Sequence, residues 1–159
     1  CPCGFYTDPR KTCHCNSHKI ANYIGKISGP LLDRIDIHIE LPSIKYKELT
    51  ETKDAETSVV IKVRVEKARA IQQERFKSER ILCNAQMNSK LIKKYCLLDN
   101  EARELLKMAM LELGLSARAY DKVLKIARTV ADFENSDTIN PSHISESIQY
   151  RSLDRQLWL

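Results

Sequence analysis

Helix boundary signals in the second half of the chain constrain the fold more than any other feature. Asp99 can cap the start of a helix, and Gly114 suits the left-handed position that ends it. Ser116 can cap the next helix, and Asn140 followed by Pro141 can begin the last one. Helices with such short connections predict a bundle of roughly 75 residues, which is large enough to fold alone.

Apolar residues recur at helical spacing behind the first two caps, so each of these helices has one face for a core. They are Ala102, Leu105, Leu106, Ala109, Met110 and Leu113 in the first helix, and Tyr120, Val123, Leu124, Ala127, Val130 and Ala131 in the second. Ile139 and Ile144 fit a hydrophobic staple around the third cap. We expect a shorter helix over residues 89–95.

A β-branched run at residues 59–65 could form a strand by propensity alone. It continues directly into residues 66–75, which are strong helix formers. We therefore expect one helix over residues 58–77, preceded by a polar loop over residues 50–57. Near the amino terminus, Ile20, Ile24 and their neighbours fit another short helix.

Residues 35–41 alternate strictly between apolar and polar side chains, and Pro42 follows them. This period predicts a strand with one buried face. A single strand needs partner strands that this chain does not supply, so we expect the chain to be a piece of a longer protein. The predicted fold is mainly α: a helical bundle preceded by the truncated end of an α/β domain, of which one strand remains.

Several self-contained activities are excluded by missing motifs. The chain has only four glycines and no Gly-x-x-x-x-Gly-Lys-Ser/Thr phosphate loop or dinucleotide fingerprint. It also has no His-Glu-x-x-His zinc site and no nucleophile elbow. We expect this chain to be inactive as an enzyme by itself.

The charge and cysteine usage fit a cytoplasmic protein with no membrane span. The net charge is +5, without a long Lys/Arg run, so solvated helix faces explain it better than nucleic-acid binding. No apolar run is long enough to cross a membrane. The six cysteines come without a secretion signal or a dense disulfide framework, which favours a reducing compartment.

Two arginines are candidate anion-binding residues. Arg34 lies between a turn and the expected strand, and its planar fork suits phosphate; an ion pair with Asp33 or Asp36 is the alternative. Arg118 lies in the first turn after Ser116, where the helix dipole favours acidic residues. A cation at that position indicates either an incoming anion or an acidic neighbour in the fold.

Three further cations, Lys122, Lys125 and Arg128, follow Arg118 on a broad face at helical spacing. This stripe could meet phosphate or acidic groups. A solvated helix face is an equally good interpretation.

Four cysteines near the amino terminus form two pairs, Cys1 with Cys3 and Cys13 with Cys15. Four thiolates are the ligand set of a tetrahedral zinc site, although the spacing of one residue is tighter than usual. The alternative is four reduced thiols in a loop. His14 and His18 are spare ligands, whereas Cys83 and Cys96 fit the pattern of buried small apolar residues.

Several of these stretches together resemble one family. They are Cys1-Pro2-Cys3-Gly4, the Cys13/Cys15 pair, Tyr23, the signature segment Ser28-Gly29-Pro30-Leu31-Leu32-Asp33-Arg34-Ile35-Asp36, Ser116-Ala117-Arg118-Ala119, and Ala127-Arg128-Thr129-Val130-Ala131-Asp132. In these stretches the chain resembles the C-terminal part of magnesium-chelatase-like AAA+ proteins, and their ComM-type branch of competence and recombination proteins most closely. The signature segment is also similar to the corresponding stretch of MCM-type helicases.

The resemblance implies a hexameric ring that binds ATP and Mg²⁺ between subunits in the full-length protein. Arg34 would be the arginine finger, which acts on ATP held by a neighbouring subunit, and Arg118 would be the sensor 2 residue. The Walker A and Walker B motifs would lie upstream of this chain. The implied domains are a core remnant at 1–45, a linker with an inserted helix at 46–84, and a helical lid at 85–159.

The resemblance further implies ATP-driven remodelling of DNA by the parent protein. A chelatase that inserts metal into a porphyrin is another branch, but the cysteine-rich segment favours the ComM type. A zinc-containing helical module that binds DNA without enzymatic activity is the rival hypothesis. A helical protein-interaction domain without a ligand is the third.

Overall fold

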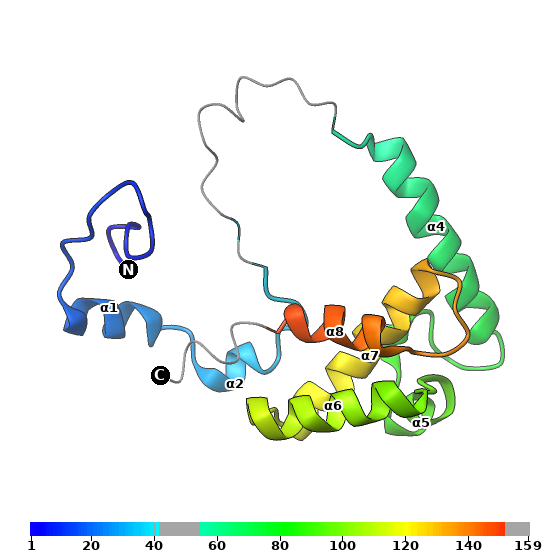
Figure 1. Ribbon diagram of the computed structural model, residues 1–159. Helices are drawn as coiled ribbons and strands as arrows, with labels where there is room; N and C mark the ends of the chain where they lie inside the picture. The colour runs from blue at the N-terminus through cyan, green and yellow to red at the C-terminus, as the bar shows by residue number, and fades with distance from the viewer. Residues whose placement is uncertain (40, 42–54, 152–159) are drawn as a thin grey trace.

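A computed structural model describes residues 1–39, 41 and 55–151 of the protein, which are mainly helical and contain no β-strand. The helices follow one another along the chain as shown in Figure 1. They are α1 (Ser17–Ile24), α2 (Gly29–Leu32), α4 (Ser58–Arg75), the 3-10 helix η1 (Asn84–Gln86), α5 (Ser89–Tyr95), α6 (Asn100–Leu113), α7 (Ala117–Phe133) and α8 (Pro141–Gln149). No helix in these described ranges is both long and apolar enough to cross a membrane.

The predicted caps of the bundle helices are confirmed. The side chain of Asp99 accepts from the N–H of Ala102 at 2.7 Å, and Gly114 ends α6 at φ 59°. Ser116 caps α7, and Asn140 caps α8 ahead of Pro141. The helix expected over 58–77 is α4, which ends two residues earlier, and α5 has the predicted bounds.

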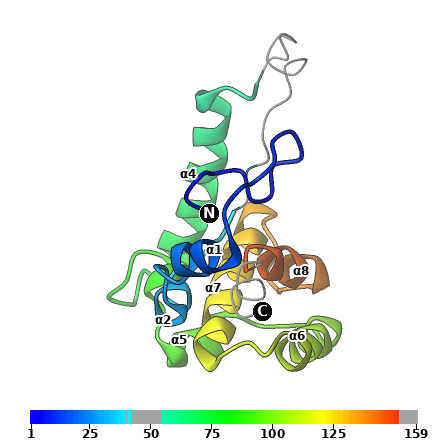
Figure 2. The ribbon, with the colours of Figure 1, turned by 90° about the vertical axis from the view of Figure 1, so that its left-hand side faces the viewer.

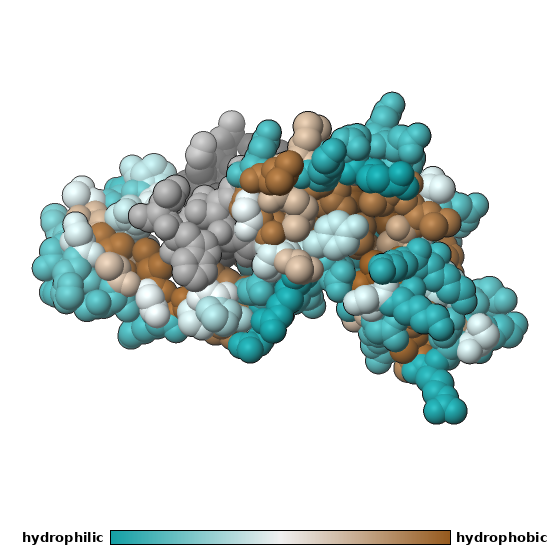
Figure 3. Space-filling view, turned by 90° about the horizontal axis from the view of Figure 1, so that it is seen from below, coloured by the Kyte–Doolittle hydropathy of each residue, from teal (hydrophilic) through white to brown (hydrophobic). Residues whose placement is uncertain are grey.

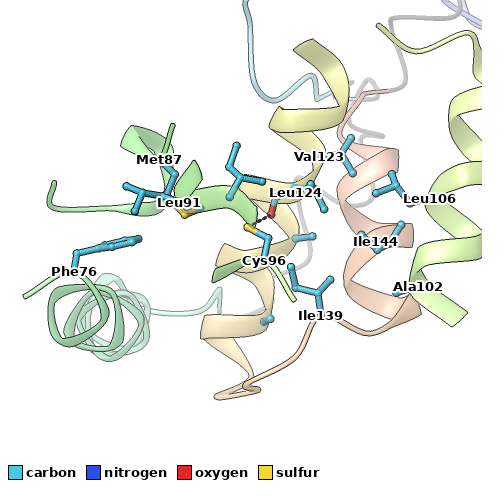
Figure 4. Close-up of a cluster of buried hydrophobic side chains, with 13 residues drawn as sticks. Phe76, Met87, Leu91, Cys96, Ala102, Leu106, Val123, Leu124, Ile139 and Ile144 are labelled. Carbon is cyan, nitrogen blue, oxygen red and sulfur yellow. Dashed lines mark hydrogen bonds between the residues drawn. The ribbon is translucent and has the colours of Figure 1, made fainter. Parts of the chain in front are cut away.

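Helix α7 lies at the centre of the bundle, which we define as residues 55–151. It packs against α4, α5, η1 and α8, while α6 packs against α8. Figure 4 shows the apolar side chains that these helices bury between them. They are Phe76, Met87, Leu91, Ile92, Cys96, Ala102, Leu106, Val123, Leu124, Ala127, Ala131, Ile139 and Ile144.

A buried polar network fastens α4 and η1 to α7. The Asp132 carboxylate is fully buried and accepts from Arg75 Nη1 at 2.8 Å, Asn84 Nδ2 at 2.7 Å and Arg128 Nε at 3.1 Å. Arg128 also donates to the backbone carbonyl of Asp137 at 2.7 Å. Burial lowers the pKa of the Arg128 guanidinium, although Asp132 opposes that shift. Each buried charge therefore has a partner, which a stable bundle requires.

The amino-terminal arm, residues 1–39, is packed far less closely. Helix α1 has no buried residue, and only Leu32 and His38 are buried in the whole arm. Figure 1 shows α1 and the loop before it standing away from the bundle, and Figure 2 views the molecule from the side on which they lie. The arm touches the bundle through the signature segment and His38, whose N–H donates to the carbonyl of Tyr150 at 2.7 Å.

The strand predicted over residues 35–41 is wrong for the described part of that range. Ile35, Ile37, Ile39 and Leu41 would share its buried face, yet they are 40%, 47%, 67% and 85% exposed. A strand needs a ladder of backbone partners, and no described segment provides one. Figure 3 shows apolar patches on the surface of both the arm and the bundle. Glu40, Pro42 and residues 50–54 of the expected loop lie outside the described residues.

Candidate functional site

The signature segment contacts the first turn of α7, although the two are 83 residues apart in the chain. Ser116 makes the link with its hydroxyl. Its Oγ accepts from the N–H of Ala119 at 3.1 Å and donates to Asp33 Oδ1 at 2.8 Å. One side chain thus caps α7 and holds the signature segment against it.

Asp33 is the acidic neighbour of Arg118. Its Oδ2 lies 3.9 Å from Arg118 Nη1, and a carboxylate near the start of α7 also complements the helix dipole. The Arg118 side chain is nonetheless 68% exposed, and such an exposed ion pair is worth about 0–1 kcal/mol. Asp33 therefore accounts for a cation at this position while leaving its guanidinium accessible to an anion.

Arg34 presents an exposed side chain next to that contact. Neither Asp33 nor Asp36 pairs with it: Asp33 faces Ser116 and Arg118, and Asp36 pairs with Lys122. Within the described residues, no hydrogen bond or ion pair involves the Arg34 guanidinium. The local ion pair that was the alternative for Arg34 is absent there.

The three cations that follow Arg118 on α7, namely Lys122, Lys125 and Arg128, all contact other groups of the protein. Lys122 Nζ donates to the backbone carbonyl of Arg34 at 2.5 Å and pairs with Asp36, and Lys125 Nζ donates to the carbonyl of Ala85 at 3.0 Å. Arg128 is buried in the network around Asp132. Lys122 and Arg128 thus meet acidic groups, one of the two partners expected for the stripe, and a solvated face describes none of the three cations.

Lys122 and Arg151 both hold the signature segment, and sequence reasoning singled out Lys122 but missed Arg151. Arg151 is buried, donates to the carbonyl of Ile35, and lies 4.0 Å from the Asp33 carboxylate. The signal for Lys122 was its position one helical turn after Arg118. Arg151 carried no comparable signal, since it lies 116 residues from its carbonyl partner.

The four-cysteine cluster, Cys1, Cys3, Cys13 and Cys15, is assembled as the ligand hypothesis requires. Their four sulfur atoms all lie within 4.8 Å of one another. The backbone N–H of Phe5 lowers the pKa of the Cys3 thiol. The N–H of Cys15 also favours the Cys13 thiolate, but desolvation and the neighbouring sulfurs leave the pKa of Cys13 raised. Neighbouring thiolates oppose one another's ionisation, because like charges repel.

The other candidate ligands lie outside this cluster. His14 and His18 contribute no atom to it, and His18 Nε2 instead contacts Asn22 Nδ2 at 3.0 Å. Cys96 is buried as predicted, and burial raises the pKa of its thiol to about 12. Cys83 is only half-buried.

Comparison with known proteins gives two family matches. Residues 55–151 match "Magnesium chelatase, subunit ChlI C-terminal", and residues 1–49 match "Magnesium chelatase, subunit ChlI". The chain belongs to the magnesium-chelatase-like AAA+ family.

The similar relatives are bacterial proteins. The chain is 38% identical over 157 residues to competence protein ComM of Haemophilus influenzae and 37% identical to the uncharacterized protein YifB of Escherichia coli. It is 26% identical over 151 residues to the uncharacterized protein Rv2897c of Mycobacterium tuberculosis. These matches cover 95–98% of the chain but only 29–30% of each relative, so the chain spans about a third of their length.

Proposed function

We propose that this chain is the ATP-responsive C-terminal region of a ring-forming AAA+ ATPase that remodels DNA. Arg34 acts in trans as the arginine finger on ATP held by the neighbouring subunit, and Arg118 acts as the sensor 2 residue. The proposal also assigns residues 1–45 to the end of the nucleotide-binding core, 46–84 to the linker and inserted helix, and 85–159 to the lid.

The contact between Asp33 and Ser116 carries this proposal. It joins the residue before Arg34 to the cap two residues before Arg118, at 2.8 Å. A change in the position of α7 would therefore displace the signature segment, which contains Arg34. Both arginine side chains are exposed, as groups that meet a phosphate from outside this chain must be.

Arginine chemistry supports the two roles. Phosphoryl transfer spreads negative charge over the transferred group, and a cation placed against it lowers the barrier. An arginine keeps its charge and donates paired hydrogen bonds to phosphate oxygens. This chain has no phosphate loop, so the ATP and its Mg²⁺ are held by residues outside it. The DNA substrate and the hexamer rest on the likeness to the ComM type.

Arg34→Ala in the full-length protein tests the first role. We expect ATP turnover to fall by about 10³ to 10⁵, the loss typical of an arginine finger, while ATP binding survives. Arg80→Ala is the matched control, because it removes an exposed arginine far from the signature segment in sequence. Normal turnover in the Arg34→Ala protein would exclude the finger.

Arg118→Ala tests the sensor role. We expect ATP-dependent ring assembly and turnover to weaken, with sedimentation velocity measured with and without nucleotide as the readout. A variant that assembles and hydrolyses ATP normally would remove Arg118 from the site.

The rival function, a DNA-binding module without enzymatic activity, is favoured by the compact four-cysteine cluster. A DNA titration of the 159-residue chain at several salt concentrations separates the two. Under our proposal the chain alone binds DNA weakly. Tight, strongly salt-dependent binding without any upstream sequence would favour the module.

A further inference from the structure

We infer that the four-cysteine cluster binds one Zn²⁺ ion, which closes residues 1–15 into a small metal-held knuckle. The site is structural, because four protein thiolates fill a tetrahedral zinc shell and leave no position for water or substrate. This inference does not depend on the proposed ATPase function.

The sulfur positions fit one tetrahedral ion. Zinc–sulfur bonds of about 2.3 Å place the four sulfurs of a tetrahedron about 3.8 Å apart. The sulfur of Cys1 lies 3.3 Å from that of Cys3 and 3.6 Å from that of Cys13, and the last two are 3.6 Å apart. All four are within 4.8 Å of one another, which leaves room for a single ion but not for an iron–sulfide cluster.

The backbone explains how a spacing of one residue can supply two ligands. The N–H of Gly4 donates to the carbonyl of Cys1 at 3.0 Å, and Gly4 has a positive φ of 82° that other residues rarely adopt. This turn brings the first two sulfurs to the same side of the chain. In the second pair, the N–H of Cys15 donates to Cys13 Sγ at 3.4 Å, a contact that would stabilise a bound thiolate.

Apart from local contacts such as Arg10 with Asp8 and Lys11 with Phe5, residues 1–16 have no packing that would hold this conformation. None of them is buried, so they have no apolar core of their own. Small segments without a core generally need a disulfide or a metal to keep one structure. All four cysteines are free thiols here, which leaves the metal.

The ion would also anchor the start of α1. Cys15 immediately precedes Asn16, whose side chain caps the helix by accepting from the N–H of Lys19 at 2.9 Å. Since α1 has no buried residue, its amino-terminal end has no apolar packing to fix it. A zinc ligand at the residue before the cap supplies that fixed point.

Metal analysis of the 159-residue chain, purified under reducing conditions without chelator, tests the inference. We expect one zinc per chain by mass spectrometry, and less than a tenth of that in Cys3→Ser and Cys13→Ser variants. Cys83→Ser is the matched control and should retain the full content, because Cys83 lies outside the cluster. Equal zinc in the wild-type and cluster variants would overturn the site.

Two further measurements keep the result unambiguous. Co²⁺ added to the metal-free chain should give the visible absorption of tetrahedral cobalt thiolate, which neither cluster variant should show. The far-UV circular dichroism transition of the bundle should be the same in all variants, so that lost metal is not lost folding. A wild-type chain with no metal and no cobalt spectrum, or one that carries iron instead, would refute a zinc knuckle.

Discussion

In the bundle, α7 buries seven residues along its length, whereas α1 in the arm buries none. Both helices have a side-chain cap and an amphipathic sequence, so helix propensity does not explain the difference. The bundle supplies α7 with packing partners on several sides, while the described chain supplies α1 with none. An amphipathic sequence therefore predicts that a helix will pack against another element, but it does not show that such an element is present.

The comparison also separates two kinds of charged group. The bundle surrounds Asp132 with donors and removes it from water. The exposed Arg34 and Arg118 are left where they can meet a group from outside the chain. Buried charges in this protein serve stability, and the exposed arginines are the candidates for function.

Asp132→Ala should break the bundle most severely. It leaves the guanidinium groups of Arg75 and Arg128 without their shared buried anion, a loss that typically costs about 3–5 kcal/mol. The free energy of unfolding in urea measures it. Asp137→Ala is the control, since its exposed carboxylate lies outside the network, and it should change stability by less than about 0.5 kcal/mol. Equal losses in the two variants would contradict the role of the network.

The same substitution made in both regions tests the difference in packing directly. Ile144→Ala empties a fully buried position in the bundle core and should cost about 2–5 kcal/mol. Ile27→Ala removes a side chain that is 48% exposed in the arm and should cost less than about 0.5 kcal/mol. Urea unfolding of both variants provides the comparison. A large loss for Ile27→Ala would mean that the arm packs more tightly than its exposure indicates.

Ser116→Ala should loosen the junction between the two regions. It removes a helix cap, at a cost of about 1 kcal/mol, and also the bond to Asp33. Asp99→Ala removes a cap of the same kind that has no contact with the arm. Both variants should lose similar stability, but only Ser116→Ala should speed amide hydrogen exchange in α2. Faster exchange in both would show that the arm responds to general destabilisation.

The smallest expected effect at neutral pH concerns the ionisation of Cys96, which matters only in alkali. Because burial raises its pKa from an ordinary value near 9 to about 12, the folded state favours the neutral thiol. The resulting contribution of Cys96 to the free energy of unfolding is fully present below pH 9 and is lost as the pH rises towards 12. Stability should therefore fall less steeply above pH 9 in Cys96→Ala than in the wild type. At pH 8, Cys96 should also resist alkylation while the half-buried Cys83 reacts; equal reaction rates would contradict the burial.

Much of the bundle could be predicted from sequence because its signals are local. Asp99, Gly114, Ser116 and Asn140 each act on backbone groups within one helical turn, and each was confirmed at its position. The strand over residues 35–41 was wrong because alternation describes only one partner of a sheet. A ladder also needs a second strand, and no described segment supplies it.

The sequence by itself determined the helices and their caps, because those depend on residues a few positions apart. It also indicated the four cysteines as a candidate ligand set. Only the tertiary structure decided that Arg128 is buried, that Lys122 holds the signature segment, and that Asp33 meets Ser116 across 83 residues. These contacts join distant segments, and helical periodicity contains no information about which segments the folded chain will bring together.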